Sequence, residues 1–328
     1  MKIMKSSHKK VFSLLITLLV VLVSFSVSGK LIRMRIDTSF YNSSLFDIKR
    51  LNVTFESSGY KLYGEVYYPK DTSLLYPVVI FCIGQPGYVS AYRWIPMEIA
   101  KRGYVSMLFD PPGLGYSEGI FPNWNLSINF LNLYLRYFAF IETPIHYCHG
   151  RWTRALLDAL EFLLGLEDVQ HVIDKRRIGL VGHSLGGATV TEVAANSSYN
   201  FSAVVALSLV TPSSVGKIKA PLMLQSGDLD FFPIFPMIMC PSYDRANPPR
   251  ELIMIQSATH FGFTTAWGPF CPCPKWQKEI SFHYIINWLD YFVKGKKDAY
   301  KNLTVAVPHL SKIYHSKYNF GDGDHIIA

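Results

Sequence analysis

Residues 177–188 read Arg177-Ile-Gly-Leu-Val-Gly-His-Ser-Leu-Gly-Gly-Ala188. Residues 178–181 form a short apolar run of strand length, and the residues from 188 onward favour a helix. Gly-His-Ser-Leu-Gly lies between them, so the order is strand, sharp turn, helix. Because glycine has no Cβ, Gly182 and Gly186 allow the strand and the helix to approach closely around Ser184. We therefore expect Ser184 to project from a tight turn at the carboxyl end of a strand.

The pattern Gly-x-Ser-x-Gly, placed between a strand and a helix, is typical of a nucleophilic serine. The N-terminal amides of the following helix face the negative charge that develops near the hydroxyl. A free serine hydroxyl is a weak nucleophile, so this chemistry also requires a base within hydrogen-bonding reach and a third group that orients the base. The alternative is a glycine-rich turn with a solvated serine, and residues farther along the chain favour the first interpretation.

Short apolar runs alternate with segments of helical periodicity over most of the chain. Two early segments alternate apolar and polar residues as antiparallel strands do, and the later runs are continuously apolar, as buried parallel strands are. This alternation predicts an α/β fold with a mostly parallel central sheet and helices on both faces. The expected strands are 51–55, 60–68, 78–83, 104–109, 178–181, 203–209, 222–225 and 252–255, and the expected helices are 93–102, 152–164, 188–195 and 280–293.

Candidate partners for Ser184 follow the last two expected strands. Asp228 and Asp230 lie after residues 222–225, in the sequence Gly227-Asp-Leu-Asp-Phe-Phe-Pro233. His260 lies after residues 252–255, in the sequence Ser257-Ala-Thr-His-Phe-Gly262. A carboxylate and a histidine at these places are the two groups that an activated serine requires.

These motifs, in this order, resemble the α/β-hydrolase superfamily, in its small serine-esterase branch near the dienelactone hydrolase-like and cutinase-like enzymes. The resemblance covers residues 51–295 and implies an α/β-hydrolase fold. In this family the nucleophile is followed along the chain by the acid and then by the histidine. The resemblance therefore implies Ser184 as the nucleophile, Asp230 as the acid in a Gly-x-x-Asp-x-x-Pro pattern, and His260 as the base.

The neighbouring polar residues are interpreted as structural. Asp228 is expected to be a solvated turn residue. His283 lies within an expected helix, where packing is favoured, and His183, beside the serine, is expected to pack or to form a local hydrogen bond. The loop Asp110-Pro-Pro-Gly-Leu-Gly115 resembles a family loop with Pro112 in place of an arginine, and it is also expected to be structural.

A tetrahedral intermediate needs N–H donors for its oxyanion. The backbone N–H of Leu185, directly after Ser184, is one candidate. The other is the backbone N–H of Gln85, in the sequence Ile83-Gly-Gln-Pro-Gly87, which resembles the residue after the His-Gly pair of the family. Ile83 stands where the family has that histidine, so the loop lacks a stabilising side chain while its backbone donor is unaffected.

Only 46 positions separate Ser184 from Asp230, and two strands lie between them, which leaves no room for a large cap domain. Residues 118–150 carry an apolar, aromatic segment that is interpreted as a lid or flap over the site, or as part of the core. The predicted organisation is an N-terminal segment 1–29, a spacer 30–50, a catalytic domain 51–297, and a tail 298–328 with no assigned role.

The N-terminal segment has four lysines in its first ten residues and an uncharged apolar run at 11–27, as a signal peptide or a single membrane anchor does. An excess of Asn-x-Ser/Thr sequons fits an exported, glycosylated domain. We expect an extracytoplasmic protein, held to the membrane by residues 11–27 if uncleaved and secreted if cleaved. The sequons begin at Asn42, Asn52, Asn125, Asn196, Asn200 and Asn302.

The net charge of +8 does not indicate a nucleic-acid surface, because seven basic residues precede the first acidic residue, Asp37. The five cysteines include Cys271-Pro-Cys273, but no second ligand pair exists, so a metal site is not expected. A hydrolysis that uses a serine, a histidine and an aspartate needs no cofactor, and none is expected. One disulfide among Cys240, Cys271 and Cys273, or from one of them to Cys148, is consistent with an extracellular location.

Together these patterns predict a serine hydrolase that cleaves a small-molecule or lipid-like carboxylic ester through an acyl-enzyme. Two alternatives remain at this point. One is a serine peptidase of the prolyl or aminopeptidase type. An acidic cluster that could bind a substrate amine would favour it, and the sequence does not show one. The other is a non-catalytic binding domain on the same fold. An incomplete Ser-His-Asp set would favour it, whereas candidates for all three positions are present.

Overall fold

The computed structural model describes residues 45–85, 87–119, 150–208, 214–230, 238–265, 274–304, 307, 310–315 and 325–327. All of them belong to one of the two compact units into which the chain divides, the unit that spans 42–123 and 141–328. The expected membrane segment 11–27, nearly all of the expected lid 118–150, and three of the cysteines lie outside the described residues.

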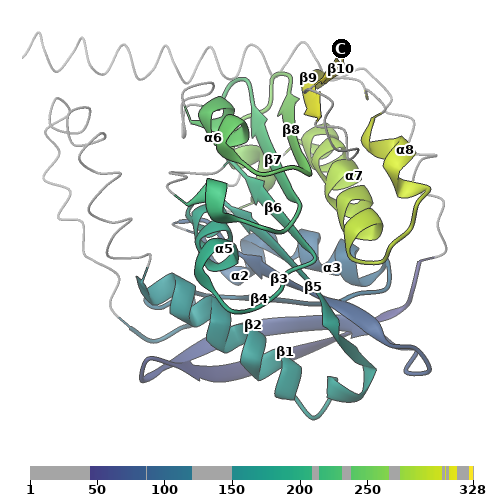
Figure 1. Cartoon of the computed structure of the whole chain (residues 1–328). Coiled ribbons are helices and arrows are strands. Elements are labelled where there is room, and N and C mark those ends of the chain that lie inside the picture. The colour runs from purple at the N-terminus through teal and green to yellow at the C-terminus, as the bar shows by residue number, and fades with distance from the viewer. Residues whose placement is uncertain are drawn as a thin grey trace, which may run out of the picture. The chain divides into compact units, whose positions relative to one another are not determined.

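A twisted, mostly parallel sheet forms the centre of this unit (Figure 1). Its strands lie in the order β1-β2-β4-β3-β5-β6-β7-β8-β9-β10, and those from β4 to β8 in this order are parallel to one another, whereas β1, β2, β9 and β10 pair antiparallel. The mostly parallel sheet predicted from the sequence is therefore confirmed. The strands are β1 Ile48–Ser57, β2 Tyr60–Pro69, β3 Tyr76–Cys82, β4 Val105–Phe109, β5 Ile173–His183, β6 Ala203–Leu207, β7 Leu222–Gly227, β8 Arg250–Ile255, β9 Leu310–His315 and β10 His325–Ile327.

Helices cover both faces of this sheet, as the alternation of elements predicted. Figure 1 shows α5 and α6 on one side of the strands, and α3 and α7 on the other. Residues 150–165 form a further helix. The labelled helices are α2 Val89–Tyr92, α3 Trp94–Ala100, α5 Leu185–Asn196, α6 Met239–Arg245, α7 Lys275–Phe292 and α8 Ala299–Leu303.

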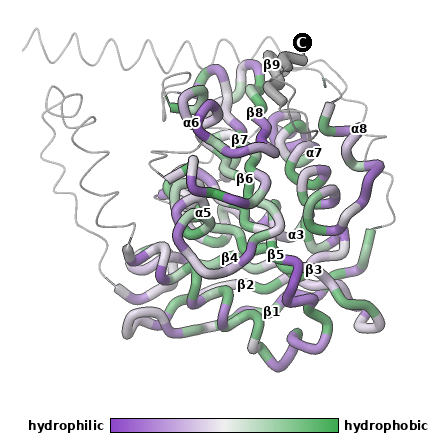
Figure 2. The backbone as a smooth tube through the Cα atoms, in the orientation of Figure 1, coloured by the Kyte–Doolittle hydropathy of each residue, from purple (hydrophilic) through white to green (hydrophobic). Residues whose placement is uncertain are grey.

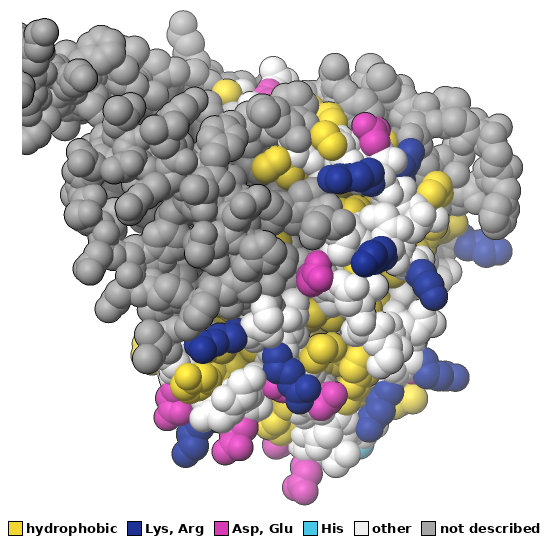
Figure 3. Space-filling view, turned by 60° about the vertical axis from the view of Figure 1, so that its left-hand side comes forward, with side chains coloured by type: hydrophobic (Ala, Val, Ile, Leu, Met, Phe, Trp, Pro, Cys, Tyr) yellow, Lys and Arg dark blue, Asp and Glu magenta, His cyan; other side chains and the backbone are white. Residues whose placement is uncertain are grey.

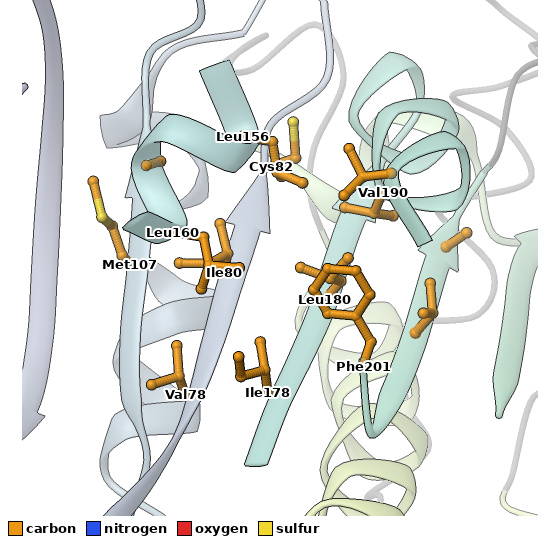
Figure 4. Packing of buried hydrophobic residues seen from close by; sticks show 14 of the residues in the cluster. Val78, Ile80, Cys82, Met107, Leu156, Leu160, Ile178, Leu180, Val190 and Phe201 are labelled. Carbon is orange, nitrogen blue, oxygen red and sulfur yellow. The ribbon is translucent and has the colours of Figure 1, made fainter. Parts of the chain in front are cut away.

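The core lies between the sheet and the helices, and the centre of the sheet is its most hydrophobic part (Figure 2). Successive side chains of a strand point to opposite faces, so Val78 and Ile80 of β3 share one face. Both belong to one buried cluster with Leu156 and Leu160 of the helix 150–165, in which Ile80 lies beside Leu160 (Figure 4), and all four are fully buried. Burial of each such side chain contributes about 1.5–3 kcal/mol. This packing fixes the strand ends that carry the candidate site.

The sheet extends beyond the domain end expected from the sequence. Residues 310–315 form β9, which pairs antiparallel with β8, and β10 pairs with β9. The segment 298–328, predicted to be a tail without a role, thus supplies one helix and two strands at the edge of the sheet. At the other edge, β1 begins at Ile48, three residues before the predicted strand.

The surface of the described residues carries both signs of charge. In the view of Figure 3, Lys and Arg side chains lie among Asp and Glu side chains and small hydrophobic patches. No single-sign field covers the described part of that face, so the positive net charge of the chain is not concentrated there.

Candidate active site

Four loops meet at one edge of the sheet, where its parallel strands end. They follow β3, β5, β7 and β8, and they carry Gln85, Ser184, Asp230 and His260 respectively. Ligands bind in open α/β sheets at this edge, outside the carboxyl ends of the strands. The fold therefore brings residues that are far apart in the sequence into one small region.

Ser184 occupies the strained turn between β5 and α5. Its backbone has φ 54° and ψ −119°, and residues other than glycine rarely adopt a positive φ. Its N–H donates to the carbonyl of Leu207 in β6 (2.8 Å), and its carbonyl accepts from the N–H of Ala188 (3.1 Å). These bonds and the surrounding packing hold a conformation that costs about 1–3 kcal/mol in isolation.

The two glycines of the motif are required by close backbone contacts. A Cβ at Gly182 would lie 2.3 Å from the carbonyl oxygen of Gly186, and a Cβ at Gly186 would lie 2.1 Å from the carbonyl oxygen of Cys82. Both of these oxygens belong to the backbone, so neither could move away as the end of a flexible side chain could. The packing therefore requires glycine on both sides of Ser184, as expected from the sequence.

Hydrogen bonds connect Ser184 to His260 and His260 to Asp230. Ser184 Oγ lies 3.0 Å from His260 Nε2, and His260 Nδ1 lies 3.1 Å from Asp230 Oδ1 and 3.3 Å from Oδ2. The three residues are 7%, 6% and 4% exposed, respectively. A carboxylate only accepts, so Nδ1 carries the proton, and Nε2 is left to accept from the Ser184 hydroxyl.

Burial also favours the neutral form of His260, which the contacts between Ser184, His260 and Asp230 require. It lowers the pKa of His260 below its ordinary value, because an imidazolium loses its hydration in the interior. The resting ring is therefore neutral near pH 7, with Nε2 available as a proton acceptor. An accepting nitrogen 3.0 Å from a serine hydroxyl is the arrangement of a general base and its nucleophile.

The two aspartates after β7 have different partners. Asp230 contacts His260 and also lies 3.3 Å from the Oγ of Ser226, which donates to Oδ2. Asp228 is exposed, and its Oδ1 accepts the backbone N–H of Ser257 at 2.6 Å. The structure thus places Asp230, rather than Asp228, beside the imidazole. The bond from Asp228 to the loop of His260 was not predicted from the sequence.

Gln277 of α7 supports the site and was not predicted from the sequence. Its side-chain amide donates from Nε2 to the carbonyl of Thr259 (2.9 Å) and accepts the Thr259 N–H at Oε1 (3.3 Å). A Cβ at Gly262 would lie 1.8 Å from Gln277 Oε1. Gln277 therefore holds the backbone beside His260. A glutamine within an amphipathic helix carries no sequence signal for such a contact.

The segments that carry the two predicted oxyanion donors both lie next to Ser184. Leu185 begins α5, so its N–H is among the first amides of the helix, which have no acceptor within the helix. Gln85 lies in a turn closed by the N–H of Gly87 and the carbonyl of Gly84 (2.8 Å). A Cβ at Gly84 would lie 2.9 Å from the Cβ of Ser184, so this turn lies directly against the serine.

Asp110, at the end of β4, holds the segment that follows this turn. Its Oδ1 accepts the N–H of Val89 at 2.6 Å, and its Oδ2 accepts the N–H of Tyr116 at 3.0 Å. The side chain is fully buried, and burial raises its pKa from 3.8 to about 6. Its role is structural, as the sequence analysis expected for this loop.

This raised pKa predicts an unusual pH dependence of stability. Between about pH 4 and pH 6 the folded protein binds a proton at Asp110 more tightly than the unfolded chain does, so the stabilisation from this group is greatest at low pH and is lost as the pH rises through 6. The unfolding free energy of the wild type, measured relative to Asp110→Asn, should fall by about 1 kcal/mol between pH 5 and pH 7.5. Denaturant titrations of both proteins at the two pH values measure it. A relative stability that rises with pH would contradict the assignment.

The remaining candidate residues fall outside this chain of contacts. His283, in α7, is buried with its Nε2 2.9 Å from the carbonyl of Asn302. Cys82 is a buried free thiol. Within the described ranges, no three His, Cys, Asp or Glu side chains are grouped to hold a metal ion. The described helices also include none with the length and apolar character needed to cross a membrane.

Comparison with known proteins agrees with this architecture. The model of the alpha/beta hydrolase family matches residues 82–321, nearly three quarters of the chain. The chain therefore belongs to the alpha/beta hydrolase family. It is also 25% identical, over 237 residues, to the bis(hydroxyethyl) terephthalate hydrolase of Streptomyces coelicolor. That match covers 70% of this chain and 62% of the relative, so the chain spans less than two thirds of the relative's length.

Proposed function

We propose that this protein is a serine hydrolase that cleaves carboxylic esters, with Ser184, His260 and Asp230 as its catalytic residues. The observation that carries the proposal is the continuous set of contacts from the Ser184 hydroxyl through both nitrogens of His260 to the Asp230 carboxylate. Membership of the alpha/beta hydrolase family supports it, because this family places its nucleophile on the same strand–turn–helix element.

The proposed reaction follows from the position of each proton. His260 Nε2 takes the Ser184 proton as Oγ attacks the ester carbonyl, and the backbone N–H groups of Leu185 and Gln85 stabilise the oxyanion. The imidazolium, stabilised by Asp230, then donates its proton to the departing alcohol, which leaves an acyl group on Ser184. His260 then takes a proton from water as the water oxygen attacks the acyl carbonyl, and it returns this proton to Ser184 Oγ as the acyl–Oγ bond breaks, which releases the carboxylic acid and restores the resting enzyme. Each step uses groups of this chain and requires neither a metal nor a cofactor.

The name of the Streptomyces coelicolor relative supports an ester substrate over an amide. Bis(hydroxyethyl) terephthalate is an aromatic diester, and that relative is named as its hydrolase. For this chain we propose a small-molecule or lipid-like ester. The likeness concerns the class of bond, because low identity and partial coverage do not extend to the groups on either side of it.

Two matched substrate series test this proposal. The purified protein is offered p-nitrophenyl esters of increasing acyl length and p-nitroanilides of proline and other amino acids, which have related leaving groups. We expect hydrolysis of the esters and little of the anilides. Turnover confined to the anilides would support a peptidase instead. No turnover of either series by folded protein would favour a non-catalytic binding domain.

We also propose an extracytoplasmic location, anchored by residues 11–27 or secreted after their removal. The basic residues before the apolar run and the sequons after it motivate this proposal. The full chain should partition with membranes, and a chain beginning at Lys30 should not. Isolation of a soluble native form that begins near Lys30 would decide for secretion, and a full-length chain found free in the cytoplasm would contradict both.

A further inference from the structure

His183, the residue before the serine, makes two hydrogen bonds that join three loops of the site. Its Nδ1 lies 2.8 Å from the hydroxyl of Tyr92 in α2, and its Nε2 lies 3.0 Å from the backbone carbonyl of His260. Both side chains are buried. The three residues come from the segments after β3, at the end of β5 and after β8, so one pair of side chains spans the site.

The direction of both bonds follows from the chemistry of the partners. The carbonyl of His260 can only accept, so His183 Nε2 carries the hydrogen. Burial lowers the pKa of His183 to about 3, and the neutral ring has a single N–H. Nδ1 is therefore an acceptor, and the Tyr92 hydroxyl donates to it. The resulting order is Tyr92 O–H to His183 Nδ1, then His183 Nε2–H to the carbonyl of His260. We call this arrangement the Tyr92–His183 brace.

The brace contacts the parts of the site that must be held in register. The ring of His183 lies 4.8 Å from the ring of His260, between centroids. A Cβ at Gly84 would lie 2.8 Å from His183 Nδ1 and 2.9 Å from the Tyr92 hydroxyl. The turn that carries Gln85 therefore rests on the same two side chains that bond the backbone of His260.

The segment that carries Tyr92 is itself firmly held. Arg93, the next residue, makes a bidentate contact with the buried carboxylate of Glu65, with its Nε 2.8 Å from Oε2 and its Nη2 2.5 Å from Oε1. On the side of the base, the N–H of Thr265 donates to the carbonyl of Ala91 at 3.0 Å. The segment of Tyr92 is thus held to the sheet through Arg93 and joined directly to the segment of His260 through Thr265, and the brace adds a second connection between them, next to Ser184.

We propose that Tyr92 and His183 are positioning residues for ester hydrolysis, which fix the backbone of His260 and the turn of Gln85 relative to Ser184. This inference rests on the proposed function. Proton transfer requires Ser184 Oγ and His260 Nε2 to remain at hydrogen-bonding distance, and a displacement of about 1 Å can lower a rate by about 10²-fold. A neutral His183 also leaves the developing His260 cation without a like charge beside it.

Three substitutions test the brace at different points. Tyr92→Phe removes one oxygen and keeps the ring. His183→Phe keeps a ring of similar size and removes both nitrogens, whereas His183→Gln keeps an amide that can donate and accept. For p-nitrophenyl ester hydrolysis we expect kcat to fall about 10-fold in Tyr92→Phe and about 10²-fold in His183→Phe, with KM within about threefold of wild type. The kcat of His183→Gln should be about tenfold higher than that of His183→Phe.

Two matched controls remove the same chemistry elsewhere. Tyr104→Phe deletes a buried hydroxyl that donates to Asp290 (2.8 Å), and His283→Phe deletes a buried imidazole bonded to a backbone carbonyl (2.9 Å). Both should leave kcat within about threefold of wild type, even where thermal unfolding shows a comparable loss of stability. Adding Tyr92→Phe to His183→Phe should lower kcat no further, because Tyr92 acts through His183.

The result that would overturn the proposal is a His183→Phe or Tyr92→Phe protein whose kcat stays within about threefold of wild type, or whose loss the control variants reproduce. Tyr92→Phe keeps the test decisive if His183→Phe does not fold. Failure of the proposed function looks different, because the wild type would then lack ester hydrolysis, or the hydrolysis would survive in Ser184→Ala.

Discussion

Replacement of Ser184 by alanine is expected to lower kcat for ester hydrolysis by about 10³-fold or more. The substitution removes the hydroxyl oxygen that lies 3.0 Å from His260 Nε2 and leaves the backbone donors in place. Those remaining parts account for residual turnover above the rate in water. Steady-state hydrolysis of one p-nitrophenyl ester measures the loss.

The fold should survive this change. Alanine and serine have a similar cost at a positive φ, and the hydrogen bonds that hold the turn come from the backbone of Ser184. Ser58→Ala is a matched control, because Ser58 has φ 50° in the turn between β1 and β2, far along the chain from the site. It should hydrolyse the ester at the wild-type rate. Activity retained by folded Ser184→Ala would remove this serine from the mechanism.

Replacement of Asp230 by asparagine is expected to lower kcat by about 10⁴-fold, the size of effect found when a serine-hydrolase acid loses its charge but keeps its shape. The carboxylate accepts a hydrogen bond from the N–H of His260 Nδ1 at 3.1 Å, and this bond keeps Nε2 free to accept from Ser184. An asparagine amide can donate to Nδ1 and so stabilise the wrong tautomer. It also cannot stabilise the imidazolium that forms when the serine is deprotonated.

Asp228→Asn provides the control for this prediction within the same loop. Its Oδ1 accepts the N–H of Ser257, and an asparagine oxygen can accept the same bond. We expect kcat/KM within about fivefold of wild type, with circular dichroism to compare the folds. If Asp228→Asn were inactive and Asp230→Asn active, the acid would be Asp228, contrary to the hydrogen bonds seen here.

The parts of this fold that could be predicted from the sequence depend on local patterns. The apolar run before Gly182 and the helix after Ser184 define the strand, turn and helix without knowledge of distant contacts. The positions of Asp230 and His260 followed from their places after apolar runs, because parallel strands present their carboxyl ends at one edge. The parallel sheet itself follows from the same alternation of elements.

Other features depend on contacts between segments far apart in the chain. Gln277 is 18 positions from Thr259, and Tyr92 is 91 positions from His183, so neither pairing leaves a pattern in the sequence. The strand β9 was missed because residues 310–315 gain their place by pairing with β8 and β10. The predicted lid at 118–150 and the membrane segment at 11–27 stay predictions, because these residues lie almost wholly outside the part of the chain that the structure describes.

The assignment of Ser184 as the nucleophile is tested by locating the residue that a fluorophosphonate modifies. Such a reagent phosphonylates a serine only where a neighbouring base activates it. The folded protein is treated with the reagent, digested and mapped by peptide mass spectrometry, with Ser184→Ala and Ser58→Ala treated in parallel. We predict one adduct, on Ser184, present in Ser58→Ala and absent from Ser184→Ala. Ester hydrolysis by a protein that carries no adduct, or an adduct on a different residue that abolishes the activity, would contradict the assignment of Ser184 as the nucleophile.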